Sequence, residues 1–199
     1  TGEMFGEEYT LVSCADYVLT HSPGNTVSNL SSTKALADVT KSKGGMYFTS
    51  AVGELNVVEK MKAENAVIGG EGNGGIIYPE LHYGRDALVG IALFLSLLVE
   101  KEMKVSALKA SYPKYAMSKA KVALSSDMDV DELFEQIKNQ YKDKNPITID
   151  GVKIEFETAW VHLRKSNTEP IIRVYTEAHN EEAAQSLANR FVNEIKGFF

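Results

Sequence analysis

The chain has 199 residues, of which 44% are apolar and 24% charged, and its formal net charge is −6. This composition is ordinary for a globular protein of one large or two small domains. A negative charge without a basic stripe argues against nucleic acid as a partner. Cys14 is the one cysteine, so an intrachain disulfide framework is excluded, and we expect a structural thiol. So few cysteines are typical of a reducing compartment, and we therefore expect a cytoplasmic protein. The four histidines show no metal-ligand spacing, so we expect no metal site here.

Helical and extended patterns alternate along the first part of the chain. Helical spacing of apolar residues predicts helices at 7–19, 32–43, 54–64 and 86–103. Short apolar runs predict strands at 26–30, 46–50, 66–68 and 76–78. The apolar stretch 88–99 is too short to cross a bilayer, which takes roughly 20 residues, so we expect a helix buried in a core and no membrane partner. The alternation predicts an α/β domain over 1–111, with a mostly parallel sheet covered by helices.

The remaining residues, 112–199, predict a smaller α+β domain with helices on an antiparallel sheet. Strands are expected within 114–125 and over 153–164 and 171–177. One helix is expected over 129–141, and a final helix should begin after Asn180. Asn180 is a favourable N-cap residue, and acidic residues follow it in the first turn, where the helix dipole favours negative charge.

A glycine-rich segment follows the strand predicted at 66–68. Residues 69–75, G-G-E-G-N-G-G, hold five glycines in seven positions, and glycine lets the backbone approach a ligand closely. The side chains left in this segment are those of Glu71 and Asn73. A carboxylate that accepts from neighbouring hydroxyls, beside an amide that both donates and accepts, suits a sugar. A flexible hairpin loop is the alternative, and for a glycine-rich stretch alone it is the favoured one.

Residues 164–170, R-K-S-N-T-E-P, form a short polar loop between two predicted strands. Arg164 offers a planar fork of donors at the mouth of this loop. Further hydrogen bonds to a phosphate dianion would come from backbone amides and from the side chains of Ser166, Asn167 and Thr168. Turns commonly use the same residue types, so the residues alone leave a structural turn equally open. A helix capping box also fits, but the proline that follows argues against it.

Together the two loops resemble those of the α-D-phosphohexomutases, the superfamily of phosphoglucomutase, phosphomannomutase and phosphoglucosamine mutase. Residues 71–75 match the sugar-recognition loop of that family's third domain, written G-E-x-S/N-G. Residues 164–170 match the phosphate-binding loop of its fourth domain, R-x-S-G/N-T-E-P. The segments 27–32, 51–53 and 84–87 stand in family-like order, so the resemblance covers nearly the whole chain. The glycine-rich loop and its continuation look most like the archaeal-type phosphoglucosamine mutases.

The resemblance implies a site residue by residue. It assigns sugar binding to Glu71, Gly72, Asn73 and Gly74. Phosphate binding falls to Arg164, Ser166, Asn167 and Thr168, with Arg173 as a further helper. The implied reaction interconverts hexose 1-phosphate and 6-phosphate through a phosphoserine, a bisphosphate intermediate and Mg²⁺.

Two motifs of the family do not occur in this chain. These are the phosphoserine loop of its first domain, T-A-S-H-N-P-like, and the metal loop of its second, D-G-D-x-D-R. We therefore expect the recognition part of a longer enzyme, with no catalytic residue of its own, with Mg²⁺ bound outside this chain and with the N-terminal domains as its missing partners. We expect this chain alone to be inactive.

Smaller departures concern the cation of the third domain. Gly75 stands where some family members have a histidine, and Glu54 follows the V-G motif where some have a lysine or arginine. Two other classes stay open. A different phosphosugar enzyme, such as an isomerase, would need a base in a cleft, and no His–Glu constellation is evident. A non-catalytic module that senses phosphosugars would need only the two loops.

Overall fold

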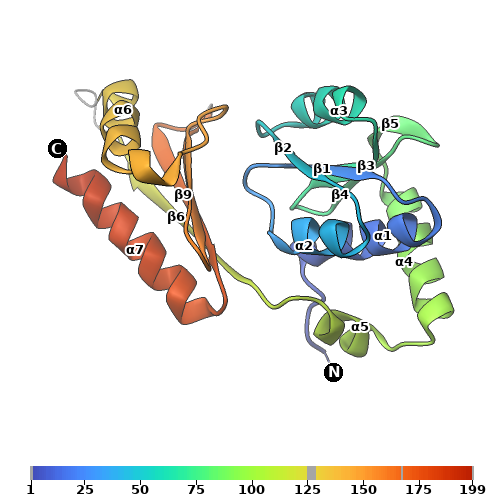
Figure 1. Cartoon of the computed structure of the whole chain (residues 1–199). Coiled ribbons are helices and arrows are strands. Elements are labelled where there is room, and N and C mark those ends of the chain that lie inside the picture. The colour runs from blue at the N-terminus through green and yellow to red at the C-terminus, as the bar shows by residue number, and fades with distance from the viewer. Residues whose placement is uncertain (1, 125–128, 167, 199) are drawn as a thin grey trace. The chain divides into compact units, whose positions relative to one another are not determined.

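The computed structural model describes residues 2–124, 129–166 and 168–198. The chain divides into two compact units, Thr1–Lys114 and Tyr115–Phe199, and each unit combines one sheet with its own helices (Figure 1). They are called unit 1 and unit 2 below. Among the described helices, none is both long enough and apolar enough to cross a membrane.

Unit 1 is built on a five-stranded sheet with the strand order β2-β1-β3-β4-β5. Its strands are β1 (Asn25–Asn29), β2 (Tyr47–Ser50), β3 (Ala66–Glu71), β4 (Gly75–Tyr78) and β5 (His82–Arg85). β1 pairs in parallel with β2 and with β3, whereas the β3–β4 and β4–β5 pairs are antiparallel. The predicted α/β class is confirmed, and the sheet is mixed. Its parallel half brings the carboxyl ends of three strands to one edge, where ligands bind in such sheets.

Helices cover both faces of this sheet. The helices of unit 1 are α1 (Glu7–His21), α2 (Ala35–Ser42), α3 (Glu54–Ala63), α4 (Ala87–Lys101) and α5 (Val105–Ser111). In Figure 1, α3 lies on one face of the sheet and α1 and α2 lie on the other. Helical spacing places Val57 and Met61 on the inner side of α3, where they pack against Val27 and Ile77 of the sheet. This apolar contact holds α3 on the sheet.

The long helix α4 differs from the prediction. Leu93 and Leu97 are buried, as expected. Four other large apolar side chains are exposed, with Leu88 and Val99 at 77% and Ile91 and Leu95 above half. The prediction of a helix buried in the core is therefore wrong for one face. A helix that is apolar all round indicates burial on every side only when a partner exists for each side.

The thiol of Cys14 lies inside α1. The residue is fully buried, and its Sγ donates to the carbonyl oxygen of Gly90 in α4 at 3.4 Å. Burial raises the pKa of this thiol to about 12, because a thiolate loses its hydration in an apolar interior. Cys14 is therefore a packing residue at the contact between α1 and α4.

Unit 2 is a four-stranded antiparallel sheet with the order β6-β9-β8-β7. Its elements are β6 (Ala116–Ala123), α6 (Val130–Gln140), η1 (Lys142–Lys144), β7 (Val152–Glu155), β8 (Trp160–Lys165), β9 (Ile171–Ala178) and α7 (Glu181–Gly197). The predicted class of this part is confirmed, and Asn180 caps α7 by accepting from the backbone N–H of Ala183 at 2.8 Å. The prediction of one continuous strand over 153–164 is wrong, because the structure has two strands there, β7 and β8. The centre of this segment turns back, with Phe156 N–H donating to the oxygen of Ala159 at 2.8 Å.

The two faces of the unit 2 sheet differ in chemistry. One face contributes Leu163 and Val174 to a core that includes Ile137 of α6 and Phe191 of α7. Side chains alternate between faces along a strand, so the residues between them point the other way. That opposite face, called the open face below, carries mainly polar and charged residues: Lys119, Lys121, Lys153, His162, Arg164, Arg173 and Tyr175.

His162 is buried on the open face although its ring is polar. It is 1% exposed, and its Nε2–H donates to the carbonyl oxygen of Asp150 at 2.7 Å. Burial lowers the pKa of His162 to about 4, since the protonated ring would lose its hydration. The imidazole is therefore neutral in the folded chain at neutral pH.

This burial predicts a pH dependence for unit 2. Unfolded histidine takes up a proton near pH 6.5, whereas folded His162 does so near pH 4. Between these values the unfolded state binds the extra proton, so stability falls as the pH falls, by roughly 3 kcal/mol at most. Urea unfolding at pH 7 and pH 5, followed by the fluorescence of Trp160, measures this loss, because Trp160 is the chain's one tryptophan and is 2% exposed.

The matched variant is His162→Gln, which keeps a donor for Asp150 and cannot titrate. Its stability should change less with pH than that of the wild type. Equal losses in the two proteins would contradict a buried neutral His162.

Candidate functional site

The carboxylate of Glu71 is buried at the carboxyl end of β3, with the residue 5% exposed. Its Oε1 accepts from the Nδ2 of Asn29 at 2.9 Å and from the backbone N–H of Gly53 at 3.2 Å. Its Oε2 lies 3.6 Å from the Nη1 of Arg85. These donors come from the end of β1, the residue before α3 and the end of β5. A buried carboxylate persists only with such partners, so Glu71 joins three elements of unit 1.

Asn29 connects this carboxylate to the glycine-rich loop. Its Oδ1 accepts from the backbone N–H of Ser31 at 2.9 Å and from the hydroxyl of Ser32 at 3.1 Å. The Ser32 hydroxyl oxygen in turn accepts from the backbone N–H of Gly72 at 2.9 Å. Asn29 and Ser32 therefore hold the loop against the carboxyl end of β1.

The local geometry requires a glycine at one position of this loop and favours one at a second. Gly74 has a φ of +88°, and its N–H donates to the carbonyl oxygen of Glu71 at 3.2 Å, which closes a tight turn that L-residues rarely adopt. A Cβ on Gly72 would collide with the carboxylate of Glu8. That carboxylate accepts from the backbone N–H of Thr33 at 2.8 Å. Part of the glycine content is therefore explained by the turn itself.

Asn73 is the exposed side chain at the tip of the turn. Its Oδ1 accepts from the backbone N–H of Gly75 at 3.2 Å, which leaves the amide nitrogen at the surface to donate. The four residues predicted for sugar binding thus lie together at the carboxyl edge of the sheet. Their two polar side chains differ in access, because Glu71 is buried and Asn73 is exposed. The Oε2–Nη1 distance of 3.6 Å at Glu71 is longer than a hydrogen bond.

Arg85 is a site residue that the sequence analysis missed. Its Nε donates to Glu54 Oε2 at 2.9 Å, and its backbone N–H donates to Glu54 Oε1 at 3.0 Å. The backbone hydrogen bond, with help from the side chain, lowers the pKa of the Glu54 carboxyl. A Cβ on Gly75 would come within 2.7 Å of the Arg85 Cδ. Gly75 and Glu54, the two departures from the family pattern, both contact Arg85, and this shared neighbour was not readable from the sequence.

The loop predicted to bind phosphate, called the phosphate loop below, begins at Arg164, near the end of β8. Its Nε lies 3.1 Å from Asp150 Oδ2, and no other acceptor in the described part of the chain contacts its terminal amino groups. Arg164 stands directly opposite Arg173 in the β8–β9 register. Like charges opposite each other destabilise a sheet. Each is offset by one carboxylate here, Asp150 for Arg164 and Glu169 for Arg173, the latter at 3.2 Å.

Ser166 lies at the centre of this loop and is buried. Its Oγ is 3.4 Å from the backbone nitrogen of Thr168 and 3.4 Å from the Nη2 of Arg173. Thr168 is exposed, and Asn167 lies outside the described residues. The structure therefore brings Arg164, Ser166, Thr168 and Arg173 to one end of the β8–β9 pair. Asp150, which the sequence analysis did not assign to the site, is the acidic partner that positions Arg164.

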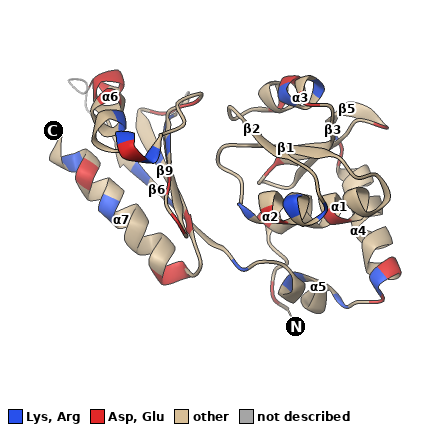
Figure 2. Cartoon of the chain, in the orientation of Figure 1, with Lys and Arg blue, Asp and Glu red and all other residues tan. Residues whose placement is uncertain are grey.

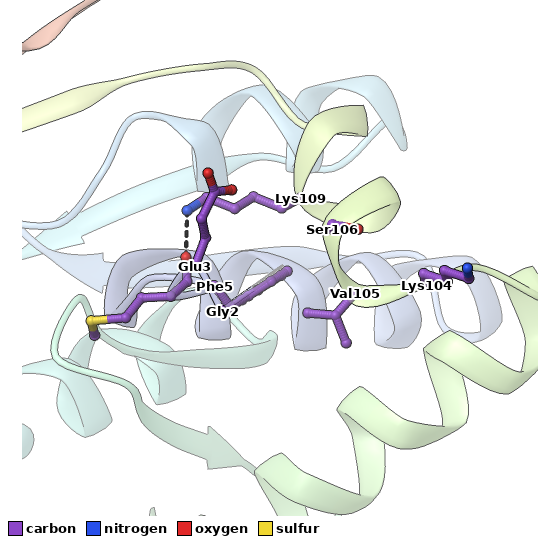
Figure 3. Close-up of a pocket in the computed structure, with 8 residues that line it drawn as sticks. Gly2, Glu3, Phe5, Lys104, Val105, Ser106 and Lys109 are labelled. Atoms are coloured by element: carbon purple, nitrogen blue, oxygen red, sulfur yellow. Dashed lines mark hydrogen bonds between the residues drawn. The ribbon is translucent and has the colours of Figure 1, made fainter.

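The described residues contain no group of three or more His, Cys, Asp or Glu side chains that could hold a metal ion. A cavity of about 250 Å³ lies elsewhere in unit 1, between the N-terminal segment and α5 (Figure 3). Lys109 crosses it to donate to the carbonyl oxygen of Met4 at 2.6 Å. Its lining includes no residue of the glycine-rich loop, so it is not part of the candidate site.

Two models of one protein family match the chain. Residues 6–115 match the model of the phosphoglucomutase/phosphomannomutase alpha/beta/alpha domain III, and residues 99–194 match that of the C-terminal domain of the same family. The chain therefore belongs to the phosphoglucomutase/phosphomannomutase family. The predicted family is confirmed.

Individual relatives are consistent with that family. A phosphoglucosamine/phosphogalactosamine mutase of Sulfurisphaera tokodaii is 39% identical over 148 residues, 73% of this chain and 32% of that protein. A phosphoglucomutase/phosphomannomutase family protein of Burkholderia thailandensis has a TM-score of 0.79 at 22% identity, over 98% of this chain and 42% of its own. An Aspergillus fumigatus N-acetylphosphoglucosamine mutase, solved with GlcNAc-6P and magnesium, has a TM-score of 0.63 at 15% identity, over 94% and 43%. These structures show the fold alone, and the chain spans less than half the length of the curated relatives it matches.

The network around Glu71 predicts a stability effect at Asn29. Asn29→Ala removes a donor from the buried carboxylate and should cost roughly 1–3 kcal/mol, the penalty for an unpaired buried polar group. Urea unfolding followed by far-ultraviolet circular dichroism measures this, while Trp160 fluorescence reports on unit 2 separately. The matched control is Asn56→Ala, which removes an exposed amide that donates to Val52 O and should cost less than about 0.5 kcal/mol. Equal losses of unfolding free energy in the two variants would contradict a special role for Asn29 in stabilising unit 1.

Proposed function

We propose that this chain is the substrate-recognition part of a phosphohexomutase that interconverts hexose 1-phosphate and 6-phosphate through a phosphoserine and a bisphosphate intermediate. The observation that carries the proposal is the pair of opposed guanidinium groups, Arg164 and Arg173, beside the buried hydroxyl of Ser166. Two like charges held face to face favour a bound anion between them. The glycine-rich loop of unit 1 supplies a second recognition surface, for the sugar. Membership of the family supports both assignments.

Each loop has a stated role in the proposal. Arg164, Ser166, Thr168 and Arg173, with Asn167, hold the phosphate that does not react. Glu71 and Asn73 hold sugar hydroxyls, and the glycines allow the ring to approach the backbone. Arg85 keeps the carboxylate of Glu71 oriented through the contact at 3.6 Å. Holding the substrate in a reactive geometry can lower a barrier by roughly 7–11 kcal/mol in favourable systems.

The chemistry of transfer belongs to parts of the whole enzyme that this chain lacks. The phosphoserine and the Mg²⁺ ion, which polarises the transferring phosphoryl group, would be held by domains that precede these two. We propose phosphoglucosamine as the substrate, supported by the archaeal-type loop and by the name of the Sulfurisphaera tokodaii relative. Phosphomannomutase or phosphoglucomutase activity is the alternative, since the family name covers both. A phosphosugar-binding module without catalysis is the third candidate.

The phosphate grip predicts the effect of Arg164→Ala. Charge-assisted hydrogen bonds contribute roughly 1.5–3 kcal/mol each, so the variant should bind glucose 6-phosphate at least about tenfold more weakly. Amide chemical shifts of the 199-residue chain during a titration measure this. Lys165→Ala is the matched control: Lys165 is the next residue of β8, is exposed, and lies on the other face of the strand. An unchanged dissociation constant for Arg164→Ala would remove this loop from the site.

The same titration tests the division of labour. The chain alone should show no mutase turnover, yet should bind glucosamine 6-phosphate, glucose 6-phosphate and mannose 6-phosphate weakly, because separated recognition elements lose pre-organisation. Shifts should gather near Ser166 with inorganic phosphate, and near Glu71 as well with the sugar phosphates. Turnover by the purified chain would contradict the proposal. A coupled assay on the longer protein distinguishes the mutases from a binding module.

A further inference from the structure

Three cations form a row across the open face of unit 2. The antiparallel registers pair Lys121 of β6 with Arg173 of β9, and Arg173 with Arg164 of β8. Side chains paired in this way lie on the same face with Cβ atoms about 5 Å apart. The row therefore runs Lys121, Arg173, Arg164, at the end of the sheet where the phosphate loop follows β8. Lys and Arg are blue in Figure 2, which shows such residues on the strands of unit 2.

The row has more positive charge than its acidic neighbours offset. Arg164 pairs with Asp150 and Arg173 pairs with Glu169. Lys121 is exposed, and within the described ranges no carboxylate, hydroxyl or carbonyl oxygen contacts its ammonium group. Three cations against two carboxylates leave one positive charge in excess.

Lys119, two residues earlier on the same strand and the same face, shows the difference. Its Nζ lies over the ring of Tyr175, 5.6 Å from the centroid, and Tyr175 is its partner in the β6–β9 register. An aromatic face stabilises a nearby cation. The lysine opposite Arg173 has a guanidinium as its cross-strand partner instead, so its position is unfavourable unless an anion lies between them.

We propose that Lys121 is a third cation of the phosphate site, binding the non-reacting phosphate of the substrate from the β6 side. This inference rests on the proposed function and adds a residue that the family motif does not contain. The phosphate lies above Arg173, with the guanidinium of Arg164 on one side and the Nζ of Lys121 on the other. The flexible four-carbon stem lets the ammonium reach a phosphate oxygen, and a compact point charge suits a phosphate dianion.

The test uses the full 199-residue chain and inorganic phosphate as the probe, followed by amide chemical shifts. Lys121→Gln removes the charge, keeps the length of the side chain nearly constant, and should weaken phosphate binding by about tenfold, the loss of one charge-assisted contact. Lys121→Arg should bind within about threefold of the wild type, because the cation remains. Lys119→Gln is the matched control, with the same strand, face and charge change, and should stay within about twofold.

The outcomes separate this inference from the proposed function. Weak binding by Lys121→Gln with near-normal binding by Lys121→Arg and Lys119→Gln supports it. If Lys121→Gln and Lys119→Gln behave alike while Arg164→Ala binds weakly, the phosphate site stands and the role of Lys121 is refuted. If Arg164→Ala also binds normally, the site itself is refuted. Trp160 fluorescence and the shifts of unit 1 check that each variant is folded, and Lys121→Glu provides a second charge variant whose binding should be weaker still.

Discussion

A carboxylate removed from water must find donors, and the carboxylate of Glu71 finds them in three different elements of unit 1. Asn29 ends β1, Gly53 precedes α3 and Arg85 ends β5. Because a buried charge without partners is strongly destabilising, these elements cannot shift independently of one another. The glycine-rich loop is held in place in the same way, through its own hydrogen bonds. A neutral sugar makes modest contacts, so it is recognised best by groups that are already in place.

Unit 2 achieves a comparable rigidity by strand register. The antiparallel pairing places Arg164 opposite Arg173, and a slip of β8 by one residue would send the Arg164 guanidinium to the opposite face, away from Arg173. The apolar residues on the core face, such as Leu163 and Val174, prevent that slip, because they would then be exposed. The arrangement of the arginines on one face is thus maintained by the hydrophobic core on the other.

The sequence predicted the class of both parts and located both polar loops between strands, because periodicity and loop composition are local properties; the binding roles of the loop residues stay predictions. It did not predict β5, whose four residues show no alternation of apolar and polar side chains, or the turn that divides 153–164. Arg85 and Asp150 were missed because each acts through a partner distant in sequence, Glu54 and Arg164 respectively. The exposed face of α4 was missed because an apolar pattern cannot say how many of its sides will be covered.

The buried thiol of Cys14 does not react with alkylating reagents while unit 1 is folded. A thiol whose pKa is raised to about 12 and whose Sγ is bonded to Gly90 across the α1–α4 contact reacts only when those helices separate. The rate at which the Cys14 thiol is labelled therefore measures how often unit 1 opens locally. Slower labelling in the presence of a hexose phosphate would reveal how far a ligand at the carboxyl edge tightens the helices behind it.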